Sequence, residues 1–160
     1  MASILIVDDD PTIRMMFARA LKDLGEVEQA SNGADALRLL SAQKFSVVLL
    51  DLHMPVIDGF VILHTLASKP GPNRDTPVYV VTADVSDQAR IRALRRHAVF
   101  FLTKPVPIGM LVNLVDASLK KSAARAAGRP SAGPQPPTSD KTSALLGAPK
   151  TTPPTSSKKS

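Results

Sequence analysis

Two patterns of hydrophobic residues alternate along residues 1–120 of the chain. Short uninterrupted apolar runs, such as those at 4–7 and 47–50, are typical of strands that are covered on both faces. Between these runs, apolar residues recur at intervals of three and four, which is the spacing of amphipathic helices. Predicted strands cover 4–7, 27–30, 47–50, 78–81 and 99–102, and predicted helices cover 11–24, 32–42, 59–67, 86–96 and 108–119.

The alternation of strands and helices predicts the fold class. Pro11 suits the first turn of a helix, and Gly25 suits the end of the same helix. Five strand–helix units with short loops predict an α/β fold, in which helices cover both faces of a five-stranded parallel sheet. Right-handed crossovers favour a doubly wound topology, and such sheets bind ligands beyond the carboxyl ends of their strands.

The composition changes near Gly128. Residues 128–160 hold seven of the fourteen prolines, are rich in Ser, Thr and Lys, and contain no aromatic residue. Such a segment buries too little apolar surface to offset the entropy of ordering it, so we expect a folded domain at 1–127 and a disordered tail at 128–160. The domain holds 15 Lys+Arg against 13 Asp+Glu, and the tail holds 5 against 1. The net positive charge therefore lies mostly in the tail and does not indicate a nucleic-acid-binding domain.

The sequence shows no cysteine, no secretory signal and no membrane-spanning stretch, and these features bear on the expected cellular compartment. There is no cysteine, which excludes disulfides and thiolate metal sites. The first apolar run is too short for a secretory signal, and Asp51 interrupts the longest apolar stretch. We therefore expect no membrane span and a cytoplasmic location.

Polar side chains with catalytic potential follow four of the predicted strands. In chain order they are Asp8, Asp9 and Asp10 after the first strand, Asp51 after the third, Thr82 after the fourth and Lys104 after the fifth. A doubly wound sheet would bring them to one cleft, where clustered carboxylates need protons or a cation. Oxygen ligands without a His or Cys partner favour Mg²⁺, and a lysine and a hydroxyl nearby would complete a site for a phosphoryl group. Aspartate can itself be the nucleophile and form an acyl phosphate.

These motifs together resemble the receiver domain of bacterial two-component response regulators, in particular the single-domain, chemotaxis-regulator-like type. The shared motifs are Ile-Leu-Ile-Val-Asp-Asp at 4–9, Asp-Leu-His-Met-Pro at 51–55 with Asp-Gly at 58–59, Val-Thr-Ala at 81–83, and Leu-Thr-Lys-Pro at 102–105. The resemblance covers about residues 3–122. It implies a flavodoxin-like sheet of strand order 2-1-3-4-5 with five helices.

The resemblance also implies the chemistry of the site. Asp51 would accept a phosphoryl group from the phosphohistidine of a sensor histidine kinase or phosphotransfer protein, and Thr82 and Lys104 would hold that group. The implied ligands of Mg²⁺ are Asp9, Asp51, the backbone carbonyl of His53 and, partly through water, Asp8. Such a protein assists its own phosphorylation and dephosphorylation and is not an enzyme that acts on other substrates.

A change of shape would follow phosphorylation in this family. Thr82 would move toward the phosphoryl group, and Phe101, which falls at the position of the family's switch aromatic residue, would turn inward. No DNA-binding or enzymatic output domain follows in the sequence. We therefore expect output through a protein partner, with the chain a monomer or weak dimer.

Several site residues have simpler interpretations. For Asp10 we favour a helix cap over a catalytic role, because it precedes Pro11. We do not expect the His53 imidazole to bind metal, since no second histidine has suitable spacing. Instead, the side chains of His53 and Asp84 are expected to flank the entrance and set how fast water hydrolyses the acyl phosphate.

Two other functions are compatible with parts of the sequence. Asp-Asp-Asp-Pro-Thr at 8–12 fits the Asp-x-Asp-x-Thr loop of haloacid-dehalogenase-type phosphatases, in which Asp8 would be the nucleophile. That interpretation leaves Asp51 and Met54-Pro55 without a role. A receiver fold could also serve only as an interaction module, although the intact site residues argue against this.

The region before the last predicted strand departs from the family pattern. The family has a Gly-Ala pair there, with the glycine in a left-handed conformation, whereas this chain has His97-Ala98. The usually polar positions that follow are Val99 and Phe100, and we predict that Phe100 contacts a partner or a second copy. The arginines of the preceding helix, Arg92, Arg95 and Arg96, are expected to form a solvated face.

Overall fold

The computed structural model describes residues 1–128, with side chains as far as Arg125. The chain divides into two units, Met1–Ala123 and Ala124–Ser160, and only the helical residues 124–128 of the second unit are described. Residues 129–160, for which the sequence predicts a disordered tail, lie outside the described residues.

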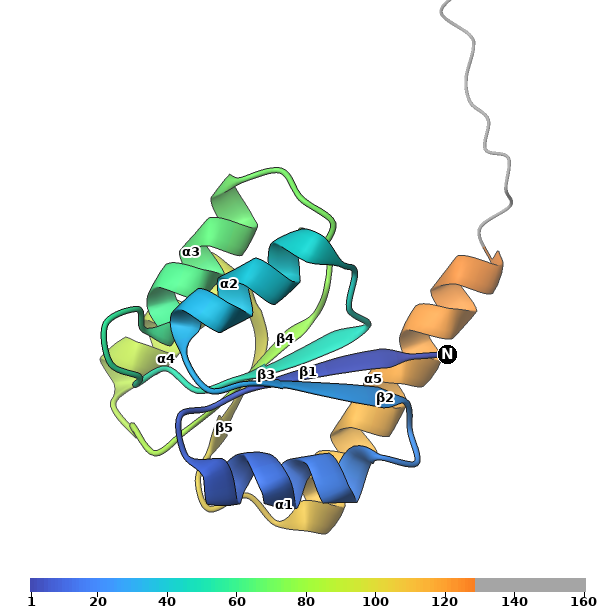
Figure 1. Cartoon of the computed structure of the whole chain (residues 1–160), viewed down its shortest axis with the longest axis horizontal. Helices are drawn as coiled ribbons and strands as arrows, with labels where there is room; N and C mark the ends of the chain where they lie inside the picture. Colours follow the sequence, from blue (N-terminus) through green and yellow to red (C-terminus); the bar gives the residue numbers. More distant parts are fainter. Residues whose placement is uncertain (129–160) are drawn as a thin grey trace, which may run out of the picture. The chain divides into compact units, whose positions relative to one another are not determined.

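Strands and helices alternate along the described chain, as the hydrophobic pattern predicts (Figure 1). The strands are β1 Ser3–Val7, β2 Glu26–Ala30, β3 Val47–Leu50, β4 Val78–Thr82 and β5 Ala98–Thr103; the helices are α1 Pro11–Leu21, α2 Gly33–Ala42, α3 Gly59–Ser68, α4 Asp87–Arg96 and α5 Ile108–Gly128. All strand pairs are parallel, and the sheet order is β2-β1-β3-β4-β5. The predicted doubly wound, flavodoxin-like topology is therefore confirmed.

The sheet carries a separate apolar core on each face. Side chains alternate in direction along a strand, so Leu5 and Val7 face one core while Ile4 and Ile6 face the other. The first core is completed by α2, α3 and α4, and the second by α1 and α5 (Figure 1). Strands β1, β3 and β4 are buried almost throughout, which explains their uninterrupted apolar runs.

Short polar residues begin most of the helices. Four helices have an N-cap side chain that accepts a backbone N–H from the first turn, and these caps are Asp10, Asn32, Asp58 and Ser86. The cap at Asp10 was predicted from its place before Pro11. Among residues 1–128, no helix combines the length and apolarity needed to cross a membrane.

A buried polar cluster ties the α3–β4 loop to the rest of the fold. The amide of Asn73 donates to the carbonyls of Leu40 and Gln43, both at 2.7 Å. Its carbonyl accepts the N–H of Phe45 at 2.7 Å and the hydroxyl of Thr76 at 2.9 Å. Since Asn73 is only 1% exposed, these bonds replace the water that its polar atoms would otherwise contact.

The turn before β5 differs from the family's glycine turn. His97 has a φ of −168°, which is extended backbone and not the left-handed conformation. Its backbone N–H donates to the carbonyl of Ala93 at 3.3 Å, and its ring Nε2 lies 3.2 Å from the carbonyl of Thr76. Histidine is therefore accommodated here without a positive φ.

Strand β5 presents two successive apolar side chains to solvent. Its pairing with β4 shifts by one residue after Ala98, so that Val99 is left without a partner in the register. Val99 is 54% exposed and Phe100 is 42% exposed. The ring of Phe100 stacks on that of Tyr79, with centroids 5.8 Å apart.

The arginines of α4, Arg92, Arg95 and Arg96, are all exposed, as expected for a solvated face, and two of them also contact α3. The guanidinium carbon of Arg92 lies 4.0 Å from the centroid of the Phe60 ring. Arg96 Nη1 lies 3.0 Å from Nδ1 of His64. Both contacts join α4 to α3, and they supplement the small buried surface of α4, whose buried residues are alanines.

Candidate functional site

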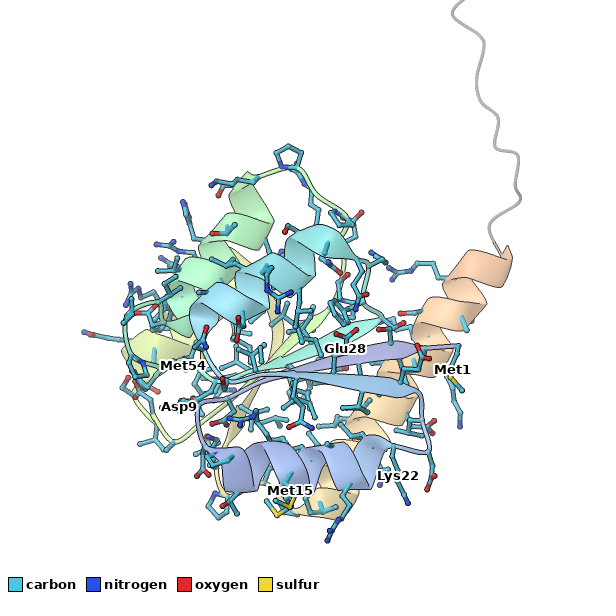
Figure 2. The ribbon with its side chains drawn as sticks, viewed as in Figure 1. Met1, Asp9, Met15, Lys22, Glu28 and Met54 are labelled. Carbon is cyan, nitrogen blue, oxygen red and sulfur yellow. The ribbon has the colours of Figure 1, made fainter. Side chains whose placement is uncertain are left out.

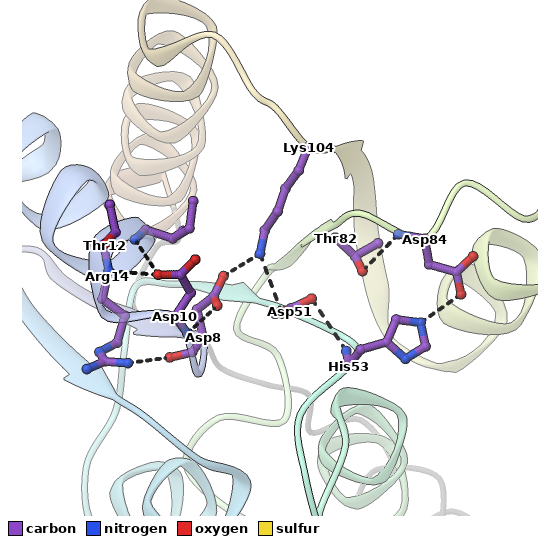
Figure 3. Close-up of polar contacts among 10 residues, drawn as sticks. Asp8, Asp10, Thr12, Arg14, Asp51, His53, Thr82, Asp84 and Lys104 are labelled. Carbon is purple, nitrogen blue, oxygen red and sulfur yellow. Dashed lines mark hydrogen bonds and ion pairs between the residues drawn. The ribbon is translucent and has the colours of Figure 1, made fainter.

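The carboxyl ends of four strands meet at one edge of the sheet, and the predicted site residues lie there (Figure 3). Asp8 follows β1, Asp51 follows β3, Thr82 ends β4, and Lys104 follows β5. Figure 2 labels Asp9 at the same end of the sheet. Because β1 and β3 are neighbours in the middle of the sheet, their aspartates face each other across a short gap.

Three carboxylates form an acidic cluster in this cleft. Asp8, Asp9 and Asp51 each offer an oxygen that lies within 4.8 Å of the other two. Asp8 is 2% exposed and Asp51 is 6% exposed, whereas Asp9 is open to solvent. Buried carboxylates at this spacing repel one another and favour a cation between them. An all-oxygen set with one open side fits Mg²⁺, which binds through few carboxylates and keeps several waters.

Lys104 reaches the cluster from the far side of β4. Its Nζ lies 2.7 Å from Oδ2 of Asp8 and 3.5 Å from Oδ2 of Asp51. The backbone N–H of Lys104 donates to the carbonyl of Thr82 at 2.8 Å, which anchors the residue next to β4. The Lys104–Pro105 peptide bond is cis.

The ionisation of the cluster follows from burial and pairing. Burial raises the pKa of Asp8, and the hydrogen bonds from Lys104 and from the N–H of Asp10 oppose this rise only in part. Burial lowers the pKa of Lys104, but its hydrogen bond with Asp8 and its attraction to Asp51 outweigh that effect, so the pKa is raised overall. The amine is therefore charged at neutral pH, and Asp8 and Asp51 share its positive charge.

The β1–α1 loop holds Asp8 in place. Oδ1 of Asp8 accepts the N–H of Asp10 at 2.9 Å, and the Asp10 carboxylate in turn accepts the N–H groups of Thr12 and Ile13. Asp10 thus caps α1. In the Asp-x-Asp-x-Thr motif of the phosphatase hypothesis, Asp10 would be the second aspartate, and its carboxylate is already bonded to the start of this helix. Arg14 Nη1 donates to the carbonyl of Asp8 at 2.8 Å. The sequence analysis did not predict this contact of Arg14. The only signal in the sequence is that Arg14 lies one turn into the predicted helix, close to the loop that holds Asp8.

Close packing positions Asp51 from the other side. A Cβ at Gly59 would lie 2.5 Å from the carbonyl oxygen of Asp51, so only glycine allows α3 to approach the end of β3. The Gly59 N–H donates to the carbonyl of Leu52 at 2.9 Å. This contact explains the Asp-Gly pair that follows the Met-Pro sequence.

The predicted entrance residues contact each other. Nε2 of His53 lies 2.8 Å from Oδ2 of Asp84, and this pair joins the β3–α3 loop to the β4–α4 loop. The N–H of Ser86 and then His53 lower the pKa of Asp84 to about 2. The hydroxyl of Thr82 is fully buried and accepts the N–H of Asp84 at 3.3 Å. His53 also places its backbone N–H 3.4 Å from Oδ1 of Asp51.

The sequence matches that of a known family. The sequence profile described as the response regulator receiver domain matches residues 4–116. The chain belongs to this family. Among its relatives, Protein PilH of Pseudomonas aeruginosa is 36% identical over 74% of this chain and 98% of PilH. The transcriptional regulatory protein PrrA of Mycobacterium leprae is 35% identical over 77% of this chain and 52% of PrrA.

Solved receiver domains share the fold. A CheY-like receiver domain protein from Methanospirillum hungatei JF-1 has a TM-score of 0.72 and 25% identity, over 78% of this chain and 98% of that one. The chain spans about half the length, or less, of the first curated relatives that it matches. PilH, by contrast, is matched over nearly its whole length.

The receiver domain's β5 carries the two aromatic residues that the sequence singled out. Phe101 is half-buried and packs against the core formed by α2, α3 and α4. Phe100 points to the other side of the sheet and remains 42% exposed. The two aromatic residues therefore differ in exposure, with Phe101 half-buried and Phe100 open to solvent.

Proposed function

We propose that the chain is a single-domain response regulator, and that Asp51 accepts a phosphoryl group from a phosphohistidine of a sensor histidine kinase or phosphotransfer protein. The observation that carries this proposal is the place of Asp51. It is buried at the end of a central strand and shares the Lys104 amine with Asp8. A buried carboxylate is costly unless it is paired, and a paired carboxylate beside an open acidic residue suits phosphoryl transfer.

Transfer to Asp51 exchanges one bond of phosphorus for another. A carboxylate oxygen of Asp51 attacks the phosphorus opposite the donor nitrogen; the new P–O bond forms as the P–N bond breaks. The imidazole of the donor keeps the bonding electron pair and takes up a proton. Lys104, at 3.5 Å from Asp51, would then contact a phosphoryl oxygen and neutralise part of its charge.

We assign Mg²⁺ to the acidic cluster. Asp8, Asp9 and Asp51, with the backbone carbonyl of His53, would hold it, with Asp8 acting partly through water. When bound, the ion supplies positive charge to the phosphoryl oxygens. The chain's own part would be to hold these oxygens in place through Lys104 and Thr82.

A switch would follow from the same contacts. Thr82 now accepts the N–H of Asp84, and donation of its hydroxyl to a phosphoryl oxygen would pull the β4–α4 loop toward Asp51. Phe101 would turn further into the core that it already contacts. The altered face around β5, which includes the exposed Phe100, would then bind a protein partner or a second copy.

The test is phosphorylation by a small donor. Purified chain is incubated with Mg²⁺ and acetyl phosphate, and its intact mass is measured for wild type and for Asp51→Asn. We expect the mass of one phosphoryl group on wild type, none on the variant, and none on wild type in EDTA. Equal phosphorylation of Asp51→Asn would exclude Asp51 as the acceptor.

A further inference from the structure

The tip of the β3–α3 loop carries a valine, Val56, whose side chain does not pack against the rest of the described chain. Val56 has a φ of 70°, the left-handed region that is unfavourable for β-branched residues. The N–H of Ile57 donates to the carbonyl of Pro55 at 2.8 Å, so the three residues form a tight γ-turn. The Val56 side chain is fully exposed and buries no apolar surface in return for this strain.

The neighbouring residues prevent Val56 from relaxing. Ile57 packs against the core formed by α2, α3 and α4. A Cβ at Gly33 would lie 2.5 Å from the carbonyl oxygen of Ile57, so the first residue of α2 packs directly against this turn. Asp58 caps α3 by accepting the N–H of Val61 at 3.0 Å. The loop is therefore held on both sides, and its tip is presented outward.

A pocket opens between Val56 and the acidic cluster. It has a volume of about 340 Å³ and lies between residues 31–34, which span the β2–α2 loop and the start of α2, and the turn formed by Pro55, Val56 and Ile57. Asp9 forms its remaining wall. We call this feature the Val56 pocket. Asp9 lines the pocket and also belongs to the acidic cluster, so the pocket lies beside the cleft that contains Asp51.

We propose that the Val56 pocket receives an apolar side chain of the phosphodonor protein, next to its phosphohistidine. This inference rests on the proposed role of Asp51. A protein that brings phosphorus to Asp51 must cover the mouth of the cleft, and its surface then extends over Asp9 and Val56. Burial of an exposed valine in such a contact supplies affinity that the isolated chain lacks. A small donor reaches Asp51 without covering the pocket.

The test compares two kinds of donor on matched variants. Val56→Thr keeps the branched shape and the strained turn but replaces a methyl group with a hydroxyl; Val56→Leu keeps an apolar side chain. Val61→Thr, at a 45% exposed position on α3 outside the pocket, is the matched control. A set of histidine-phosphorylated phosphotransfer domains is first screened, and the domain that transfers its phosphoryl group to wild type fastest is used as the protein donor. Acetyl phosphate is the small donor.

We expect Val56→Thr to lower kcat/KM with the protein donor by about tenfold, because a buried hydroxyl replaces a buried methyl group. Val56→Leu and Val61→Thr should stay near wild type, and all four proteins should react equally with acetyl phosphate. An unchanged rate for Val56→Thr with the protein donor would overturn the proposal. So would an equal loss with acetyl phosphate, or a set of domains in which none transfers faster than acetyl phosphate. Failure of wild type to react with acetyl phosphate would instead refute the role of Asp51.

Discussion

Removal of the Lys104 amine tests whether its positive charge stabilises the buried carboxylates of Asp8 and Asp51. Lys104→Met keeps the length of the side chain but deletes the charge that lies 2.7 Å from Asp8 and 3.5 Å from Asp51. Asp8 and Asp51 are almost fully buried, so the variant leaves two carboxylates in the cleft without their cation. Loss of one partner from a buried ion pair destabilises a protein by about 3–5 kcal/mol.

The expected loss for Lys104→Met lies near the lower end of that range, at about 3 kcal/mol near neutral pH without Mg²⁺. Asp8 keeps its hydrogen bond from the N–H of Asp10, and its raised pKa lets it take up a proton when the amine is gone. For a domain of this size, such a loss lowers Tm by roughly 10 °C. The loss should shrink as pH falls, since protonation of Asp8 then removes one of the unpaired charges.

The raised pKa of Lys104 predicts how the stability deficit of Lys104→Met changes at alkaline pH. A lysine whose pKa rises on folding stabilises the folded state at every pH below its unfolded value of 10.5, and this contribution disappears above the folded value. Wild type and Lys104→Met should therefore converge in stability at strongly alkaline pH. Stability is measured by urea unfolding from pH 5 to pH 12, and the two proteins should begin to converge only above pH 10.5.

Mg²⁺ should restore most of the stability of Lys104→Met. A cation that binds only the folded state stabilises it by an amount that grows with the ratio of its concentration to its Kd, and it replaces the missing positive charge. We expect the deficit in excess Mg²⁺ to fall below about 1 kcal/mol. Lys120→Met is the matched control, because the Lys120–Asp116 pair is exposed and its loss should change stability by no more than about 0.5 kcal/mol. A deficit of equal size in EDTA and in Mg²⁺ would refute the reasoning.

Two other regions give simple tests. In an NMR titration, the Asp84 carboxyl should have a pKa of about 2, and this pKa should rise toward 3.8 in His53→Ala. The contribution of Asp84 to the stability of the folded state is present above pH 3.8 and is lost as the pH falls toward 2. His53→Ala should also shorten the acyl-phosphate half-life severalfold, and an unchanged half-life would remove His53 from the entrance. Asn73→Ala should lower the free energy of unfolding by about 3 kcal/mol, because it leaves buried backbone groups unpaired. The exposed Asn113→Ala should change it by less than about 0.5 kcal/mol, and equal effects of the two variants would contradict the role of the cluster.

The main features of the fold could be predicted because they depend on local pattern. The apolar runs of β1 and β3 and the cap at Asp10 are determined by neighbouring residues. Parallel topology then brings Asp8, Asp51 and Lys104 to one edge of the sheet, so their convergence follows from strand order.

The features that escaped prediction depend on contacts between distant segments. Asn73 looks like an ordinary turn residue until the end of α2 and the α2–β3 loop are placed beside it. Arg14 lies one turn into α1, and its bond to the Asp8 carbonyl depends on how the β1–α1 loop turns back on the helix. The strain at Val56 arises because the start of α3 and the start of α2 both constrain one short turn.

The most direct measurement is a crystal structure of the chain grown with Mg²⁺, beryllium and fluoride, which form a mimic of a phosphorylated aspartate. The account predicts trifluoroberyllate bonded to a carboxylate oxygen of Asp51, with Lys104 and Thr82 contacting its fluorines and Mg²⁺ held by the acidic cluster. Trifluoroberyllate on Asp8, or an unmodified Asp51 beside a bound Mg²⁺, would contradict the account.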